Sequence, residues 1–311
     1  MKITWPHGKA FAFTVFDDTD LAVPGNFERT YGLLGDLGLR TTKSVWTGSG
    51  ADLPARSEAG SNCQDPEYLE FVLELQRNGF EIGYHNSFEW GLPRERVRAA
   101  LDRFRELFGH DPVCMSNHAS SAEGMYWGPD RLTHPFRAAY RLLQRKLRGN
   151  PHQGHVESSP YFWGDLCRER IRYVRNFVYD DIDTLRACPE MPYFDPAKPY
   201  VNAWFSSTEG PEIETCVRAL SEERQDALEA SGGACILYTH FAAGFEKDGV
   251  VDARFRRLVE RLSAKNGWFV PTGTLLDYIQ QQRGPRTLKA WERARLEAQW
   301  FAHKLAVGGT S

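Results

Sequence analysis

The strongest constraint on the fold is the alternation of short apolar, β-branched segments with segments of helical periodicity. The apolar segments are bounded by turn residues and predict strands at 10–16, 41–47, 80–84, 112–117, 174–179, 200–206, 234–239 and 268–271. Segments with helical periodicity lie between them, at 66–78, 94–107, 253–265 and 274–282. This alternation is typical of a parallel sheet covered by helices, and seven or eight strands predict a (β/α) barrel.

Two regions do not follow the alternation. Residues 120–172 form a longer stretch than one crossover needs and are rich in Gly, Pro, His and aromatic residues, so we predict an insertion or lid with one helix near 136–147. Residues 288–305 predict a charged amphipathic helix that packs on the barrel or supports a partner subunit in a homo-oligomer. We therefore expect one barrel domain over 1–285, with its insertion at about 120–172, and a helical tail over 286–311.

Composition and charge exclude several classes of protein. The chain has 311 residues, 41% of them hydrophobic and 25% charged, as in an ordinary globular protein. Its formal net charge is −3 and no long run of one sign occurs, which argues against nucleic acid or an anionic membrane as partner and favours a small-molecule substrate. No apolar stretch is long enough for a signal peptide or a membrane span, so we expect a cytoplasmic protein.

The cysteines also fit the expectation of a cytoplasmic protein. The six cysteines are scattered without CxxC spacing, and several lie in apolar segments where a reduced thiol packs as a small hydrophobic group. We expect free thiols and no zinc site made of cysteines.

Charged and imidazole side chains follow directly after predicted strands. In a parallel barrel the catalytic groups cluster at the carboxyl ends of the strands. The first strand leads into Asp17 and Asp18, and adjacent carboxylates favour a bound cation or a raised pKa on one of them. The structural alternative is that these residues cap a loop. His85 follows the third strand and, with Glu89 four residues later, can face one metal ion. His240 follows the seventh strand, where an imidazole can act as general acid or base.

Taken in order, these motifs resemble those of the polysaccharide deacetylase superfamily. Phe16-Asp17-Asp18-Thr19 is similar to its TFDDG motif, 83–87 to its G-x-H-[ST]-x-x-H motif, and 237–240 to its late L-x-H motif. The resemblance implies that Asp17 is the catalytic base, that Asp18 and His85 are metal ligands, and that His240 is the general acid.

Three departures from the family pattern stand beside this resemblance. Glu89 occupies the place of the second metal-binding histidine, so either Glu89 or His118, which follows the fourth strand, completes the site. The family's base-orienting Arg is absent from the fourth strand end, where Asn117 or His118 takes its place or hydrolytic activity is lost. Thr19 replaces the usual Gly, and Asp20 adds a carboxylate with no assigned role.

The resemblance implies an amide hydrolase that removes an N-acyl group, such as acetyl, from an amino sugar or a precursor of a cell-surface glycan. The implied cofactor is a divalent metal, Zn²⁺ first, with Fe, Mn or Co as alternatives, because imidazole and carboxylate donors suit these ions. Trp90, Asn117, Tyr126 and Trp127 are candidate substrate contacts, although most aromatic residues in such a chain fill core.

Two alternative functions remain open from the sequence. One is a barrel that has lost catalysis and binds a sugar or scaffolds glycan assembly. The other is an aspartyl-phosphate phosphatase that uses Asp18-Thr19-Asp20, with Asp180 and Asp181 as later metal ligands. The phosphatase interpretation leaves His85 and His240 without a role.

Overall fold

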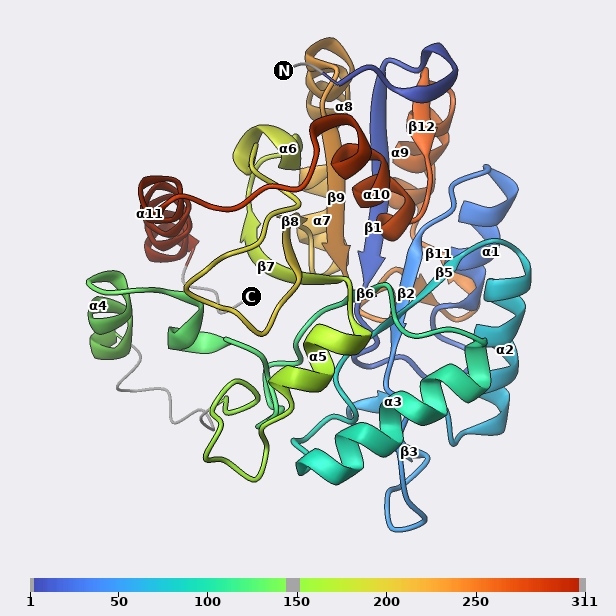
Figure 1. The fold of residues 1–311 in the computed structure, drawn as a ribbon. Coiled ribbons are helices and arrows are strands. Elements are labelled where there is room, and N and C mark those ends of the chain that lie inside the picture. The colour runs from blue at the N-terminus through green and yellow to red at the C-terminus, as the bar shows by residue number, and fades with distance from the viewer. Residues whose placement is uncertain (1–2, 144–151, 308–311) are drawn as a thin grey trace.

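A closed ring of parallel strands forms the centre of the molecule (Figure 1). The computed structural model describes residues 3–143 and 152–307. Its main sheet has the order β12-β1-β2-β5-β6-β7-β8-β9, and β9 pairs in parallel with β1, which closes a barrel of seven strands with β12 added beside β1. The prediction of a (β/α) barrel of seven or eight parallel strands is confirmed.

The strands of the main sheet are β1 (Phe11–Asp17), β2 (Thr42–Val45), β5 (Glu81–Tyr84), β6 (Cys114–Met115), β7 (Tyr173–Tyr179), β8 (Ala203–Glu209), β9 (Ala234–Thr239) and the added β12 (Gly267–Phe269). Two antiparallel hairpins lie outside it, formed by β3 (Arg56–Ser57) with β4 (Gly60–Ser61) and by β10 (Glu246–Lys247) with β11 (Val250–Val251).

The helices that surround the barrel are α1 (Glu28–Asp36), α2 (Pro66–Arg77), α3 (Arg94–Phe108), α4 (Phe136–Leu143), α5 (Gly164–Arg170), α6 (Thr184–Ala187), α7 (Ile213–Ala219), α8 (Glu222–Ser231), α9 (Ala253–Ser263), α10 (Thr272–Arg283) and α11 (Ala290–Val307). Two short 3₁₀ turns, Pro6–Gly8 and Gly128–Arg131, complete the described elements.

Helix α2 shows how local chemistry sets an element's ends. The Asp65 side chain accepts a hydrogen bond from the Glu67 N–H at 3.2 Å, and Pro66 occupies the first helical position. Gly79 follows the helix with φ of 85°, a conformation that glycine adopts without steric cost. This start and stop chemistry is as the sequence predicts.

Several element boundaries differ from the sequence prediction. β6 begins only at Cys114, because Pro112 has no N–H to give to a neighbouring strand, and it ends at Met115, two residues earlier than predicted. β8 begins at Ala203, since the residues before it form a turn in which the Val201 N–H donates to the Lys198 carbonyl. The sequence also missed α1 and α5 to α8. In α8 only Gln225 and Leu228 are buried, which leaves too weak a periodicity to detect.

The insertion and the last helix pack against each other on one flank of the barrel. α4 and α11 lie side by side there (Figure 1), with Phe136 against Phe301 at 6.0 Å and Tyr140 against Trp300 at 5.3 Å between ring centroids. Trp300 is fully buried and also contacts Phe177 of β7. The predicted helix near 136–147 is present as α4, and its last predicted residues lie outside the described ranges.

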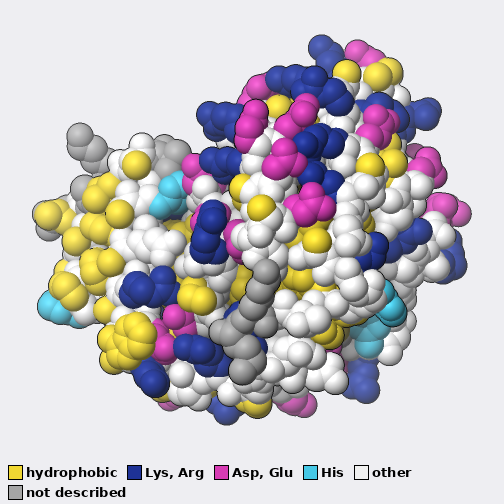
Figure 2. All heavy atoms as spheres, turned by 90° about the horizontal axis from the view of Figure 1, so that it is seen from above, with side chains coloured by type: hydrophobic (Ala, Val, Ile, Leu, Met, Phe, Trp, Pro, Cys, Tyr) yellow, Lys and Arg dark blue, Asp and Glu magenta, His cyan; other side chains and the backbone are white. Residues whose placement is uncertain are grey.

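The core is one large apolar cluster that runs through the barrel and its helices, with a small satellite of Leu53, Phe88 and Leu92. All six cysteines are free and buried, as expected. Figure 2 views the molecule from the side of the amino-terminal strand ends, and acidic and basic side chains are interspersed there. Within the described residues, no helix combines the length and the apolar composition that crossing a bilayer requires.

Candidate metal centre

The barrel fixes the backbone of three residues that follow strands at its carboxyl end. The N–H of Asp18 donates to β9 at 2.8 Å, that of His85 to β2 at 3.0 Å and that of Ser116 to β5 at 3.0 Å. Each hydrogen bond continues the ladder one residue past the strand. The side chains of these residues therefore start from positions that the barrel itself determines.

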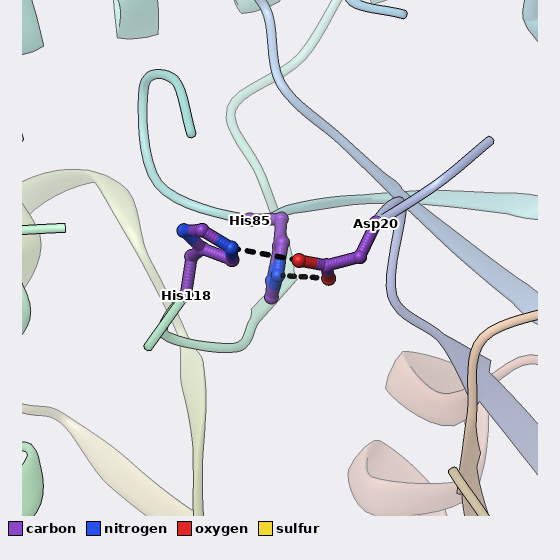
Figure 3. Close-up of side chains that lie close together, drawn as sticks. All are labelled: Asp20, His85 and His118. Carbon is purple, nitrogen blue, oxygen red and sulfur yellow. Dashed lines mark hydrogen bonds and ion pairs between the residues drawn. The ribbon is translucent and has the colours of Figure 1, made fainter. Parts of the chain in front are cut away.

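Asp20 is the centre of the cluster. Its carboxylate lies 3.0 Å from Nε2 of His85 and 2.7 Å from Nε2 of His118 (Figure 3), and 3.3 Å from Nε2 of His240. Three imidazoles from three different strand ends thus face one carboxylate. Within the described residues, two groups could hold a metal ion: Asp20 with His85 and His118, and Asp20 with Asp18 and His240, in each of which the ligand atoms lie within 4.8 Å of one another.

The second nitrogen of two of these imidazoles is engaged elsewhere. Nδ1 of His240 lies 3.0 Å from the Pro211 carbonyl, and a carbonyl can only accept, so Nδ1 carries the proton. Nδ1 of His85 lies 2.7 Å from the hydroxyl oxygen of Ser116. A neutral His240 therefore directs an unprotonated Nε2 at Asp20, and two lone pairs in contact repel unless a proton or a cation lies between them.

Burial and charge act in opposite directions on this cluster. Burial would raise the pKa of Asp20, but the charges and hydrogen bonds of the three imidazoles outweigh it and hold that pKa well below its ordinary value. Burial would lower the pKa of His118 and of His240, but hydrogen bonds from both to Asp20 raise it instead. The site is therefore arranged to keep Asp20 ionised and to place positive charge around it.

Asp18 lies beside this cluster and is held by a buried guanidinium. Arg175 of β7 donates to the two oxygens of Asp18 at 2.5 and 3.1 Å, and the Ser116 hydroxyl donates to Asp18 at 2.7 Å. The guanidinium also lies 4.1 Å from the centroid of the Tyr238 ring. Burial would raise the pKa of Asp18, but the charge of Arg175 lowers it below its ordinary value. Two parallel N–H donors of this kind orient a carboxylate.

Asp17 lies apart from the cluster although it adjoins Asp18 in sequence. It is fully buried and forms an ion pair with Lys43 of β2 at 2.9 Å. It also accepts hydrogen bonds from the Tyr31 hydroxyl at 2.8 Å and from the Phe241 N–H at 2.7 Å. Burial raises its pKa, and the Lys43 ammonium opposes that effect. Asp17 belongs to neither group of candidate metal ligands.

The loop that carries Asp20 is fixed from two sides. The Thr19 hydroxyl lies 2.6 Å from the hydroxyl of Tyr68 on α2. The Leu21 N–H donates at 2.6 Å to Ala59, in the turn between β3 and β4. Thr19, which differs from the family's glycine, thus anchors the loop through its side chain.

Two of the remaining predicted site residues lie outside the cluster. Glu89 belongs to neither group of candidate metal ligands and accepts a hydrogen bond from the Ser57 hydroxyl at 2.5 Å. The Asn117 side chain bonds both backbone polar groups of Met125, at 2.7 and 3.2 Å, which ties the start of the insertion to the barrel.

The predicted aromatic contacts divide into exposed and buried residues. Trp90 is 43% exposed and packs edge-on against Phe88. Tyr126 is 6% exposed and stacks on His155 at 4.3 Å between ring centroids, whereas Trp127 is also 6% exposed and lies under the Arg131 guanidinium at 3.6 Å. Trp90 alone of these three presents a large surface to solvent.

Sequence patterns alone assigned no role to Asp20 and did not single out Arg175, Lys43 or Ser116. Two of these had a signal. Arg175 and Lys43 are each the one charged residue of a strand whose other residues are uncharged, and a charge in a buried strand needs an opposite charge nearby. Ser116 carries no comparable signal, because serine is frequent at strand ends for other reasons.

Comparisons with known proteins show which solved structures have a similar fold. No family model matches the chain, and no curated protein matches it by sequence. Two solved structures of proteins classed as polysaccharide deacetylases do match in three dimensions. The one from Mycobacterium smegmatis has a TM-score of 0.51 and 13% identity, and the match covers 93% of this chain and 96% of that one. The one from Pseudomonas aeruginosa PAO1 has a TM-score of 0.52 and 13% identity, over 91% and 95%.

This chain has the fold of the polysaccharide deacetylases. A third solved structure, of PuuE allantoinase, matches equally well, with a TM-score of 0.51, 12% identity and coverage of 90% of this chain and 94% of that one. Proteins classed as deacetylases and an allantoinase therefore share this barrel fold. The chemistry of this chain follows from its own side chains and not from the fold alone.

Proposed function

We propose that this protein is a metal-dependent amide hydrolase that removes an N-acyl group, such as acetyl, from an amino sugar or a glycan precursor. The proposal combines the deacetylase-type fold with the cluster at the carboxyl end of its barrel, where active sites of such barrels are located. The observation that carries it is the convergence of His85, His118 and His240 on the single carboxylate of Asp20.

The donor set fits a divalent transition metal. Asp20 with Nε2 of His85 and His118 offers one carboxylate and two imidazoles, a combination that suits zinc, iron, manganese or cobalt, with zinc our first choice. A divalent ion held there would lower the pKa of a water ligand from about 15.7 to about 7 and would polarise a carbonyl.

In this proposal Asp18, rather than Asp17, is the general base. Asp18 lies in the same group as Asp20 and His240, whereas Asp17 is enclosed with Lys43. The two donors of Arg175 orient the Asp18 carboxylate, so that one of its oxygens can take the proton of an attacking water. Arg175 thereby orients the base, the role for which no arginine is present at the fourth strand end. Relative to the family motif, the base and the acidic metal ligand move to Asp18 and Asp20.

His240 is the proposed general acid. The Pro211 carbonyl fixes the orientation of its ring by accepting from Nδ1, and Nε2 faces the cluster. Protonated at Nε2, His240 can transfer that proton to the nitrogen of the leaving amine as the C–N bond breaks. Trp90, exposed on the loop that follows β5 and His85, offers an apolar face on which a sugar ring can stack.

Acetate release from N-acetylated amino sugars, free and nucleotide-linked, tests the proposal. We expect turnover that a chelator abolishes and that Zn²⁺, Co²⁺, Mn²⁺ or Fe²⁺ restores. Allantoin belongs in the same panel, because the barrel matches the allantoinase as well as it matches the deacetylases. Unchanged turnover after complete metal removal would contradict the proposal.

The two other functions lead to different outcomes of the same experiments. Sugar binding with no turnover in the metal-loaded protein would favour an inactive barrel. For a phosphatase, Asp180 and Asp181 would have to join Asp18 and Asp20, but they pair with Arg224 and Arg186 and belong to neither group of candidate ligands among the described residues. No specific observation therefore favours the phosphatase.

A further inference from the structure

Ser116 lies between Asp18, the proposed general base, and His85, a proposed metal ligand. It follows β6 directly, is fully buried, and has its backbone fixed by the N–H bond to Tyr84. Its hydroxyl oxygen lies 2.7 Å from an oxygen of Asp18 and 2.7 Å from Nδ1 of His85. One hydroxyl thus connects the proposed base with a proposed metal ligand.

The direction of these two hydrogen bonds follows from the donors available. Asp18 is in a two-donor ion pair with Arg175, which favours the carboxylate, and a carboxylate can only accept. The single hydroxyl proton of Ser116 therefore goes to Asp18. The hydroxyl oxygen is left with lone pairs only, so the contact with His85 requires a proton on Nδ1 of the imidazole.

That proton decides which end of His85 is available to a metal. With Nδ1 protonated, neutral His85 has its lone pair on Nε2, the atom that lies 3.0 Å from Asp20. Histidine ligands are commonly fixed in this way by an acceptor on the second nitrogen, and removing that acceptor typically costs about 10- to 100-fold in metal affinity.

We propose that Ser116 is a positioning residue that fixes the tautomer and orientation of His85 for metal binding while it orients Asp18. The inference rests on the proposed function in one respect, namely that a metal binds at Asp20, His85 and His118. It adds a residue for which the family resemblance gave no role. Ser116 itself touches neither substrate nor metal in this scheme.

Metal affinity, measured by competition with a chromophoric chelator, tests this without any need for turnover. Ser116→Ala should bind Zn²⁺ about 10- to 100-fold more weakly than the unchanged protein. Ser116→Thr keeps the hydroxyl and should bind about as tightly as the unchanged protein. Ser207→Ala is the matched control, since Ser207 is a fully buried serine of β8 whose hydroxyl has no hydrogen-bond partner among the described residues.

A second readout separates a lost hydrogen bond from a general loss of packing. In the Co²⁺-loaded protein, the visible absorption bands should shift in Ser116→Ala and stay in place in Ser116→Thr and Ser207→Ala. If Ser116→Ala does not fold, Ser116→Cys, which keeps the volume but offers a weak donor and acceptor, takes its place and should show the same loss relative to Ser116→Thr.

The outcomes distinguish this inference from the proposed function. Equal Zn²⁺ affinities of Ser116→Ala and Ser207→Ala would overturn the role of Ser116 and leave the metal centre standing. An equal loss in Ser116→Thr and Ser116→Ala would also overturn it, because the hydroxyl would then not be the feature that matters. If the unchanged protein binds no metal, the metal centre fails and this inference fails with it.

Discussion

At the two ends of the barrel, the pKa values of two partly buried carboxylates shift in opposite directions. At the carboxyl end, Asp20 is surrounded by three imidazoles, which hold its pKa well below the ordinary value despite burial. At the amino end, Glu81 of β5 accepts a hydrogen bond from the uncharged Gly273 N–H at the start of α10, and burial raises its pKa to about 7. Burial is similar, so the difference in charge compensation decides the direction of the shift.

The carboxyl end, with its compensated charges, is suited to catalysis, whereas the amino end is closed by packing. Near the amino end, Trp5, Trp268 and Tyr278 pack together, with ring centroids 5.1 to 6.1 Å apart. At the carboxyl end, by contrast, three imidazoles converge on the carboxylate of Asp20. Substitutions of Asp18 and Asp20 should therefore change turnover or metal binding, whereas substitutions of Asp17 and Glu81, which belong to neither group of candidate metal ligands, should change stability.

The largest effect is expected at Asp20. Asp20→Asn removes the charge shared by His85, His118 and His240, so metal binding and turnover should be lost together, by several orders of magnitude in turnover. Metal content by elemental analysis and acetate release measure the two losses. Asp180→Asn, a control at an exposed carboxylate that pairs with Arg224, should change neither. Retained metal in Asp20→Asn would show that Asp20 is not a ligand.

Asp18→Asn should separate chemistry from metal binding. Removing a general base lowers kcat by about 10²- to 10⁴-fold, and we expect this loss in a protein that still binds its metal. The measurement is kcat under metal saturation. Asp17→Asn is the matched neighbour, and its kcat per folded molecule should stay within about tenfold of the unchanged protein. The reverse order of the two effects would return the base to Asp17.

Asp17→Asn should instead reduce stability. The substitution leaves the Lys43 ammonium buried without its counter-charge, and breaking a buried pair in this way costs about 3–5 kcal/mol of unfolding free energy. Urea unfolding at pH 7 measures the change. A loss below about 1 kcal/mol, the range of an exposed ion pair, would mean that Lys43 finds another partner.

The smallest effect, at the amino end, depends on pH. Because the folded pKa of Glu81 is about 7 and its ordinary value is 4.5, folded Glu81 holds a proton between these pH values while unfolded Glu81 does not. Stability from this group is thus fully present below pH 4.5 and is lost as pH rises to about 7.

Glu81→Gln should remove this dependence. Relative to the unchanged protein, the variant should gain on the order of 3 kcal/mol between pH 4.5 and pH 7, as followed by unfolding at several pH values. Glu95→Gln, at an exposed glutamate of α3, is the control and should show no such trend. A parallel pH course for both variants would mean that Glu81 is ionised in the folded protein.

The sequence predicted the barrel well because strands in a closed parallel barrel are continuous apolar runs, and β9 was located to the residue. It also placed Asp18, His85, His118 and His240 at strand ends, which the barrel then brings together. It could not decide which of three nearby aspartates faces the imidazoles, because loop geometry after β1 depends on contacts such as that of Thr19 with Tyr68.

Arg175 was overlooked for a related reason. A motif comparison searches for an arginine at the fourth strand end, whereas this chain supplies it from within β7, the next strand of the barrel. Two neighbouring strands of a barrel can each supply a side chain to the same place in the site. A motif defined along the sequence does not detect a side chain supplied by the neighbouring strand. The packing of α11 on α4 was open for the same reason, since helical periodicity shows that a face is apolar but not what covers it.

The closure of the barrel has a consequence for how the protein is made. β1 is synthesised early, yet it pairs with β9, and the Asp17 carboxylate bonds the Phe241 N–H, 224 residues away in sequence. α11, at the end of the described chain, still has to reach its position against α4 and β7. During translation β1 therefore emerges from the ribosome long before β9 exists, and until then its edge toward β9 has no partner strand.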